Sequence, residues 1–281
     1  MSLRVCIFCG STGVTREHVF PQWLHSEPLV AASIARGFDR RPMVTPTYSL
    51  KSAETGLPGT DLVPRGGTEQ PPETLTVKVV CAPCNNGWMS QREVSTMATL
   101  APIMADIPTT LSTAELTRLA SWATKTAVIS EYLQPTSVVY DQVQRTRLMN
   151  RDRPPHNVEV FMARYVQDEA LVMRHGQQLW KSVPTDATQS VAHDVPGSSG
   201  FTLLVPGRAA FLVRSWSGGF DTDVARGAIE TDQWMEIWPR RLAEVSWPDD
   251  VPDIDGHEVD RLSIGYEHVW GPRPWLGRPQ P

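Results

Sequence analysis

Residues 6–21 read Cys-Ile-Phe-Cys-Gly-Ser-Thr-Gly-Val-Thr-Arg-Glu-His-Val-Phe-Pro, and residues 81–88 read Cys-Ala-Pro-Cys-Asn-Asn-Gly-Trp. These two stretches contain every cysteine of the 281-residue chain, as two Cys-x-x-Cys pairs: Cys6, Cys9, Cys81 and Cys84. Two residues between thiols let both sulfurs of a pair bind one ion, so the two pairs together predict a closed tetrahedral zinc site. The alternative is two disulfides or buried free thiols, but nothing else in the sequence indicates oxidising conditions.

This zinc ion would hold two distant segments together, because 71 residues lie between Cys9 and Cys81. Glu17 and His18 follow the first pair, and Asn85 directly follows the second. The ion should therefore bring a carboxylate, an imidazole and an amide into one neighbourhood. Carboxylate and amide oxygens suit a hard divalent ion such as Mg²⁺, and a neutral imidazole can accept a proton from water.

The combination resembles the HNH nucleases, the zinc-knuckle branch of the ββα-metal (His-Me finger) nucleases. Their pattern runs Cys-x-x-Cys, acid-His-x-x-Pro, Cys-x-x-Cys-Asn, and it is matched over roughly residues 4–100, about a third of the chain. The resemblance implies that His18 is the general base and that Glu17 and Asn85 bind a catalytic Mg²⁺ or Mn²⁺. It implies a structural role for the zinc.

Four neighbouring residues are candidate substrate contacts: Arg16, His25, Trp88 and Arg92. A surface or packing role is the alternative for His25, and a core position is the alternative for Trp88. The family often carries an asparagine about five residues before the second knuckle, where it helps to orient the histidine. Segment 74–81 has threonine at that place, so a threonine hydroxyl or a backbone carbonyl would have to hold the imidazole.

Length and the hydrophobic pattern predict an α+β fold in two domains. Residues 1–106 would form the HNH-like domain, interrupted by a long irregular insertion at about 26–73 that contains one edge strand at 43–50. Residues 107–281 would form an α+β domain, a helical segment followed by mostly antiparallel strands, that selects a substrate or a partner.

The individual elements follow from periodicity and from turn and capping residues. Helices are expected at 22–25, 91–104, 112–134 and 137–150, with capping boxes at Ser90/Glu93 and Ser112/Glu115; residues 138–140 fit a strand equally well. Strands are expected at 3–9, 74–80, 158–166, 201–205, 209–216, 229–239 and 262–270.

Charge and composition restrict the kinds of ligand and the cellular location that we expect for this protein. The net charge of −5 argues against a general polyanion binder, but residues 1–100 hold nine Lys or Arg against eight Asp or Glu. Of the 26 basic residues 22 are arginine, which suits phosphate contacts, although a GC-rich genome produces the same bias. The chain has no run of 18 apolar residues and no signal-peptide pattern at its start, so we expect a cytoplasmic protein without a membrane span.

The function expected from these observations is metal-dependent endonucleolytic cleavage of nucleic acid, of DNA rather than RNA. One alternative is a catalytically silent zinc module that binds nucleic acid or a protein partner. Another is that the scaffold has been recruited to chemistry other than that of a nuclease, because a fold does not determine a reaction. A homodimer is compatible with each of these functions.

Overall fold

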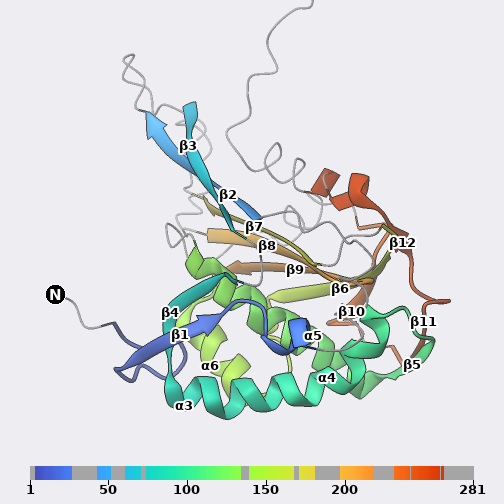
Figure 1. Ribbon diagram of the computed structural model, residues 1–281. Helices are drawn as coiled ribbons and strands as arrows, with labels where there is room; N and C mark the ends of the chain where they lie inside the picture. Colours follow the sequence, from blue (N-terminus) through green and yellow to red (C-terminus); the bar gives the residue numbers. More distant parts are fainter. Residues whose placement is uncertain are drawn as a thin grey trace, which may run out of the picture.

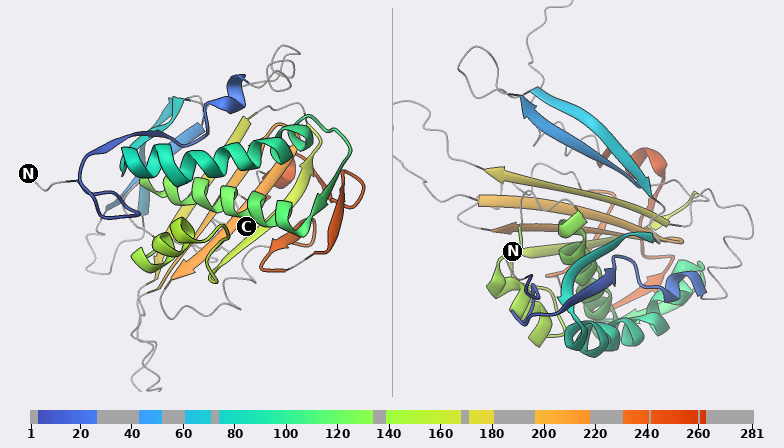
Figure 2. Two further views of the ribbon diagram at one scale, coloured as in Figure 1. Left: turned by 90° about the horizontal axis from the view of Figure 1, so that it is seen from below. Right: turned by 60° about the vertical axis from the view of Figure 1, so that its left-hand side comes forward.

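The computed structural model describes residues 4–26, 43–51, 61–70, 74–133, 139–167, 171–180, 197–217, 231–240, 242–259 and 261–262. Its centre is a twisted sheet, and three helices cover one face of this sheet (Figures 1 and 2). The helices are α4 (Ser90–Met104), α5 (Thr113–Ser130) and α6 (Gln142–Asn150). The predicted α+β class is therefore confirmed.

The central sheet is antiparallel, in the order β10-β6-β9-β8-β7, with β12 pairing in parallel with β6. Its strands are β6 (Val158–Tyr165), β7 (Leu171–Trp180), β8 (Gly197–Pro206), β9 (Ala209–Ser217), β10 (Met235–Trp238) and β12 (Asp253–Ile254). The strand predicted at 158–166 and the hairpin predicted at 201–216 are confirmed. The strand predicted at 229–239 shrinks to β10, and the one predicted at 262–270 lies outside the described residues except for Leu262, which is helical.

Three two-stranded sheets complete the described fold. β1 (Val14–His18) pairs with β4 (Thr76–Cys81), β2 (Met43–Lys51) with β3 (Asp61–Gln70), and β5 (Thr109–Ser112) with β11 (Glu244–Trp247). The edge strand expected at 43–50 is thus confirmed as β2, which pairs with β3 with a register shift after Pro46, and the expectation of irregular structure is wrong for 61–70. The remaining insertion residues lie outside the described part except Ser26.

The zinc-pair segments are built as strand, strand and helix. β4 runs directly into α3 (Ala82–Cys84), which is followed by η2 (Asn85–Met89), a segment kinked at Gly87 (φ −94°, ψ −111°), and then by α4. The strand predicted at 3–9 is wrong: Val5 makes a single bridge to Thr12, and Ile7 to Cys9 form a turn. The short helix predicted at 22–25 appears as α1 (Trp23–Ser26).

One of the two predicted capping boxes forms. The side chain of Ser112 accepts the backbone N–H of Glu115, and the Glu115 carboxylate accepts the N–H of Ser112, so α5 begins where the sequence indicates and continues into η3 (Glu131–Leu133). The Ser90/Glu93 box is wrong, because after a kink at Gly87 (φ −94°, ψ −111°) the backbone is already helical at Met89 and at Ser90, and Ser90 makes no side-chain cap. The helix predicted at 137–150 starts only at α6, behind a capping box of Asp141 and Gln144.

The larger hydrophobic core joins the zinc segments to the sheet. It contains Phe20 and Ile103 from the first predicted domain together with Trp122 and Phe211 from the second. Trp122 is fully buried and meets the Phe211 ring edge-on, with ring centroids 5.8 Å apart. The two-domain division stays a prediction, but apolar packing crosses its boundary. Among the described residues, no helix combines the length and the apolar character that a bilayer crossing requires.

Ser112→Ala should lower the free energy of unfolding by about 1 kcal/mol, because α5 loses the side-chain partner of its first free N–H groups. Urea unfolding of the zinc-loaded protein measures the change. Ser90→Ala is the matched control, since it removes the same hydroxyl from an exposed serine that caps nothing. Equal losses in both variants would contradict the helix start at Ser112.

Candidate metal centre and acid–imidazole site

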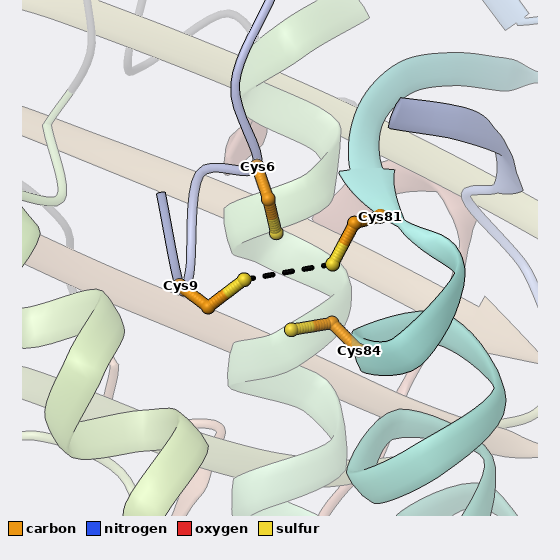
Figure 3. Close-up of side chains that lie close together, drawn as sticks. All are labelled: Cys6, Cys9, Cys81 and Cys84. Carbon is orange, nitrogen blue, oxygen red and sulfur yellow. Dashed lines mark hydrogen bonds between the residues drawn. The ribbon is translucent and has the colours of Figure 1, made fainter. Parts of the chain in front are cut away.

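The four thiols converge on one point (Figure 3). Cys6 and Cys9 come from the turn before β1, Cys81 ends β4, and Cys84 ends α3. All four sulfurs lie within 4.8 Å of one another, and the Sγ atoms of Cys9 and Cys81 are 3.5 Å apart. Sulfurs on a tetrahedral zinc ion, each about 2.3 Å from the metal, stand ~3.8 Å apart. The set therefore fits one zinc ion, while a disulfide would need sulfurs about 2.05 Å apart.

The environment of the thiols favours a cation. Burial raises the pKa of Cys81 and of Cys84, so without an ion these two groups stay protonated. Cys9 is exposed, and hydrogen bonds from the side chain and backbone of Ser11 lower its pKa to about 6. A bound divalent ion would supply the charge that lets all four bind as thiolates.

The first knuckle is held from the other half of the chain. In α6, Arg145 Nε donates to the carbonyl of Ile7 (2.9 Å), and Gln142 Nε2 donates to the carbonyl of Phe8 (3.0 Å). The ring of Phe8 also meets Trp88 edge-on, with centroids 4.9 Å apart. These contacts keep Cys6 and Cys9 facing the second pair.

Glu17 and His18 point away from each other, because successive side chains of a strand alternate between its two faces. Glu17 is only 6% exposed, and the side chain of Asn85 lies close enough to its carboxyl to lower its pKa. His18 is half-exposed, and its Nε2 lies 2.9 Å from Nε2 of Gln22. The structure thus joins the predicted acid to the predicted asparagine. Gln22 also contacts His18. The residue opposite His18 on the neighbouring strand is Thr76.

A buried ion pair beside Glu17 has no counterpart in the sequence expectations. Lys125 of α5 is 0% exposed, and its Nζ lies 2.6 Å from Oε1 of Glu93 on α4. Burial raises the pKa of Glu17 to about 7; the positive charge of Lys125 and the Asn85 side chain oppose this rise, and the negative charge of Glu93 adds to it. The only sequence signal was a single lysine within the apolar run Leu119–Ile129.

The four candidate substrate contacts differ in accessibility. Arg16 is exposed, and the side chain of His25 lies outside the described residues. Trp88 is half-buried, with the guanidinium of Arg92 4.7 Å from its ring centre. Arg92 is 6% exposed and donates to Asp152 Oδ1 (3.1 Å) and to the carbonyls of Leu148 (2.9 Å) and Arg151 (3.2 Å). Arg92 thus binds protein acceptors.

Comparison with known protein families, with curated proteins and with solved structures finds no match to this chain. The resemblance to HNH nucleases therefore rests on the residues and the geometry described above.

Protein purified without chelator should contain one zinc ion per chain, and elemental analysis measures this. Zinc binding contributes ~10–16 kcal/mol to folding in small zinc domains, so chelation should lower the thermal unfolding temperature of at least the N-terminal part. Cys81→Ser should lose the ion, whereas His18→Ala, which leaves the thiols intact, should keep it. A zinc-free wild-type preparation with unchanged thermal stability would contradict the assignment.

Glu17→Gln should stabilise the protein at alkaline pH. The carboxyl of Glu17 titrates near 4.5 when unfolded and near 7 when folded, so its ionisation costs stability as pH rises from about 4.5 to 7. Glutamine keeps an oxygen for Asn85 and removes this cost, which reaches at most about 3 kcal/mol above pH 7. Urea unfolding of the zinc-loaded protein without added Mg²⁺ or Mn²⁺, from pH 5 to 8.5, measures the difference.

Glu244→Gln is the charge-matched control for Glu17→Gln, because Glu244 is exposed. A stability difference between the Glu17→Gln variant and the wild type that does not change with pH would show that Glu17 is not buried as described.

Proposed function

We propose that this protein is a metal-dependent endonuclease of the HNH type. The observation that carries the proposal is that the Asn85 side chain lies close enough to the buried carboxyl of Glu17 to act on its pKa, on segments that the four-cysteine cluster brings together. An acid and an amide from different elements, side by side at the start of a helix, match the ligand pair that the HNH resemblance implies. The strand–strand–helix order of β1, β4 and α3–α4 supports the same assignment.

The residues divide the chemistry as follows. His18, on the half-exposed face of β1, takes a proton from water, and the resulting hydroxide attacks a phosphodiester phosphorus. A divalent ion held by oxygens of Glu17 and Asn85 would supply charge stabilisation for the phosphate and the leaving oxygen. The cysteine cluster takes no part in the reaction, because four thiolates leave no open position on zinc.

Gln22 gives His18 a side-chain partner, whereas the family often uses an asparagine before the second knuckle for this purpose. Nε2 of a glutamine donates, so the ring Nε2 of His18 accepts in the geometry described. If the Gln22 amide were rotated by a half-turn, its oxygen would accept a hydrogen bond from a protonated Nε2 of His18. The other ring nitrogen, Nδ1, would then be the one that accepts a proton from water. The contact supports a histidine held in place for base catalysis.

A catalytically silent zinc module that binds nucleic acid is the second candidate, and the ion pair of Lys125 favours it. A fully buried ammonium close enough to act on Glu17 already neutralises negative charge at the predicted metal ligands. A second cation in the same place would be repelled. Cleavage experiments separate the two candidates.

With Mg²⁺ or Mn²⁺ present, the wild-type protein should nick supercoiled plasmid DNA, and His18→Ala should reduce the rate by ~10²–10⁴ through loss of the base. A gel assay with both zinc-loaded proteins measures the rates. Cys81→Ser is a control for the fold, since it should lose activity together with zinc.

Two outcomes count against the nuclease. If the wild type leaves duplex DNA, single strands and RNA intact with each metal, the silent binding module becomes the better account. If His18→Ala cleaves as fast as the wild type, His18 is not the base.

A further inference from the structure

Residues 145–156 read Arg-Thr-Arg-Leu-Met-Asn-Arg-Asp-Arg-Pro-Pro-His, at the end of α6 and just beyond it. Four of these twelve residues are arginine and one is acidic, in a chain whose net charge is −5. The side chain of Arg145 turns inward to the first knuckle. The other three arginine side chains and the imidazole of His156 are exposed, and together they form what we call the arginine strip: Arg147, Arg151, Arg153 and His156.

Hydrogen bonds and buried prolines fix the backbone that carries the arginine strip. Arg92 donates to the carbonyls of Leu148 and Arg151, and the N–H of Arg153 donates to the carbonyl of Arg151 at 2.7 Å. Pro154 and Pro155 are buried. The strip therefore loses little backbone entropy when it binds a ligand.

The charges of the strip are available to a ligand. Its one acidic neighbour, Asp152, is paired with Arg92. Within the described part of the chain, neither Arg151 nor Arg153 has a carboxylate partner, and Arg147 contacts the imidazole of His156 at 2.9 Å. Exposed arginines paired with carboxylates would first have to lose those partners. Free guanidinium forks bind phosphate oxygens directly.

The strip is also attached to both halves of the zinc site. α6 lies beside the first knuckle (Figure 2), where Arg145 and Gln142 hold the carbonyls of Ile7 and Phe8. Arg92 stands eight residues after Cys84 and holds the other end of the segment. A polyanion lying on the strip would thus be held rigidly against the zinc module. Scattered surface arginines would not share this anchoring.

We propose that the arginine strip is a contact surface for the phosphate backbone of duplex DNA. This inference rests on the proposed function in that it takes the substrate to be nucleic acid. The strip binds and orients the duplex through charge and takes no part in cleavage. It gives an otherwise acidic protein a local site for a polyanion.

The test measures binding separately from cleavage. The parent is zinc-loaded, full-length His18→Ala protein, and the readout is fluorescence anisotropy of a labelled duplex over a range of salt concentrations without divalent ions. In this background Arg147→Gln, Arg151→Gln and Arg153→Gln together should weaken binding. They should also flatten the slope of log K against log salt by up to ~2.7, at ~0.9 for each phosphate that an arginine no longer neutralises.

The matched control removes three exposed cations elsewhere, by Arg4→Gln, Lys78→Gln and Arg240→Gln, with the same change in net charge. It should keep a slope close to that of the parent. Zinc content and circular dichroism show whether each variant is folded. If the triple strip variant does not fold, the three single strip variants replace it, and each of them should flatten the slope by ~0.9.

Equal slopes for the strip variant and the control would overturn the inference and leave the proposed nuclease standing. A parent that binds no DNA overturns the inference, and the cleavage assay on the wild type then decides separately on the nuclease. Strip-dependent binding to phosphatidylserine vesicles, without binding to DNA, would also overturn it and point to a membrane surface.

Discussion

The convergence of four thiols on one point is the constraint on which the rest of the site depends. Two turns that are far apart in sequence must meet, and this meeting places β1 against the start of the long helix that follows β4. Without a cation, the buried thiols of Cys81 and Cys84 resist ionisation. With a divalent ion, four thiolates form strong bonds, and each bond ties down backbone that would otherwise be free. The Glu17–Asn85 contact exists because of this closure.

Polar side chains from beyond residue 107 hold the two segments that carry the cysteine pairs. Lys125 reaches Glu93 from the fully buried face of α5, and Arg145 and Gln142 hold the first knuckle from α6. Glu131, at the end of α5, is itself fully buried and accepts the N–H groups of Val139 and Tyr140, just before α6. Burial raises the pKa of Glu131 to about 8. Charged groups thus position the zinc site at some cost in desolvation.

The correct and incorrect expectations have separate physical causes. Ser112 caps its helix because its own backbone is extended, whereas Ser90 cannot cap because Met89 and Ser90 are already helical, after the kink at Gly87. The turn that follows Cys81 is separated from the long helix by the kink at Gly87, and the long helix is under way before Ser90. Glu93 is consequently not needed at a helix end, and it pairs with Lys125. A capping pattern alone does not contain this tertiary requirement.

The sequence by itself indicated the four-cysteine cluster and the elements with strong periodicity, because these depend on residue type and on short spacing. Only the tertiary structure decided which side chains meet across large sequence separations. It turned Glu17 inward and His18 outward, placed Lys125 beside the acid, and assigned Arg92 to the backbone of residues 148–151. Each of these depends on which faces of α4, α5 and α6 pack together. Helical periodicity marks a buried face but does not show what that face will meet.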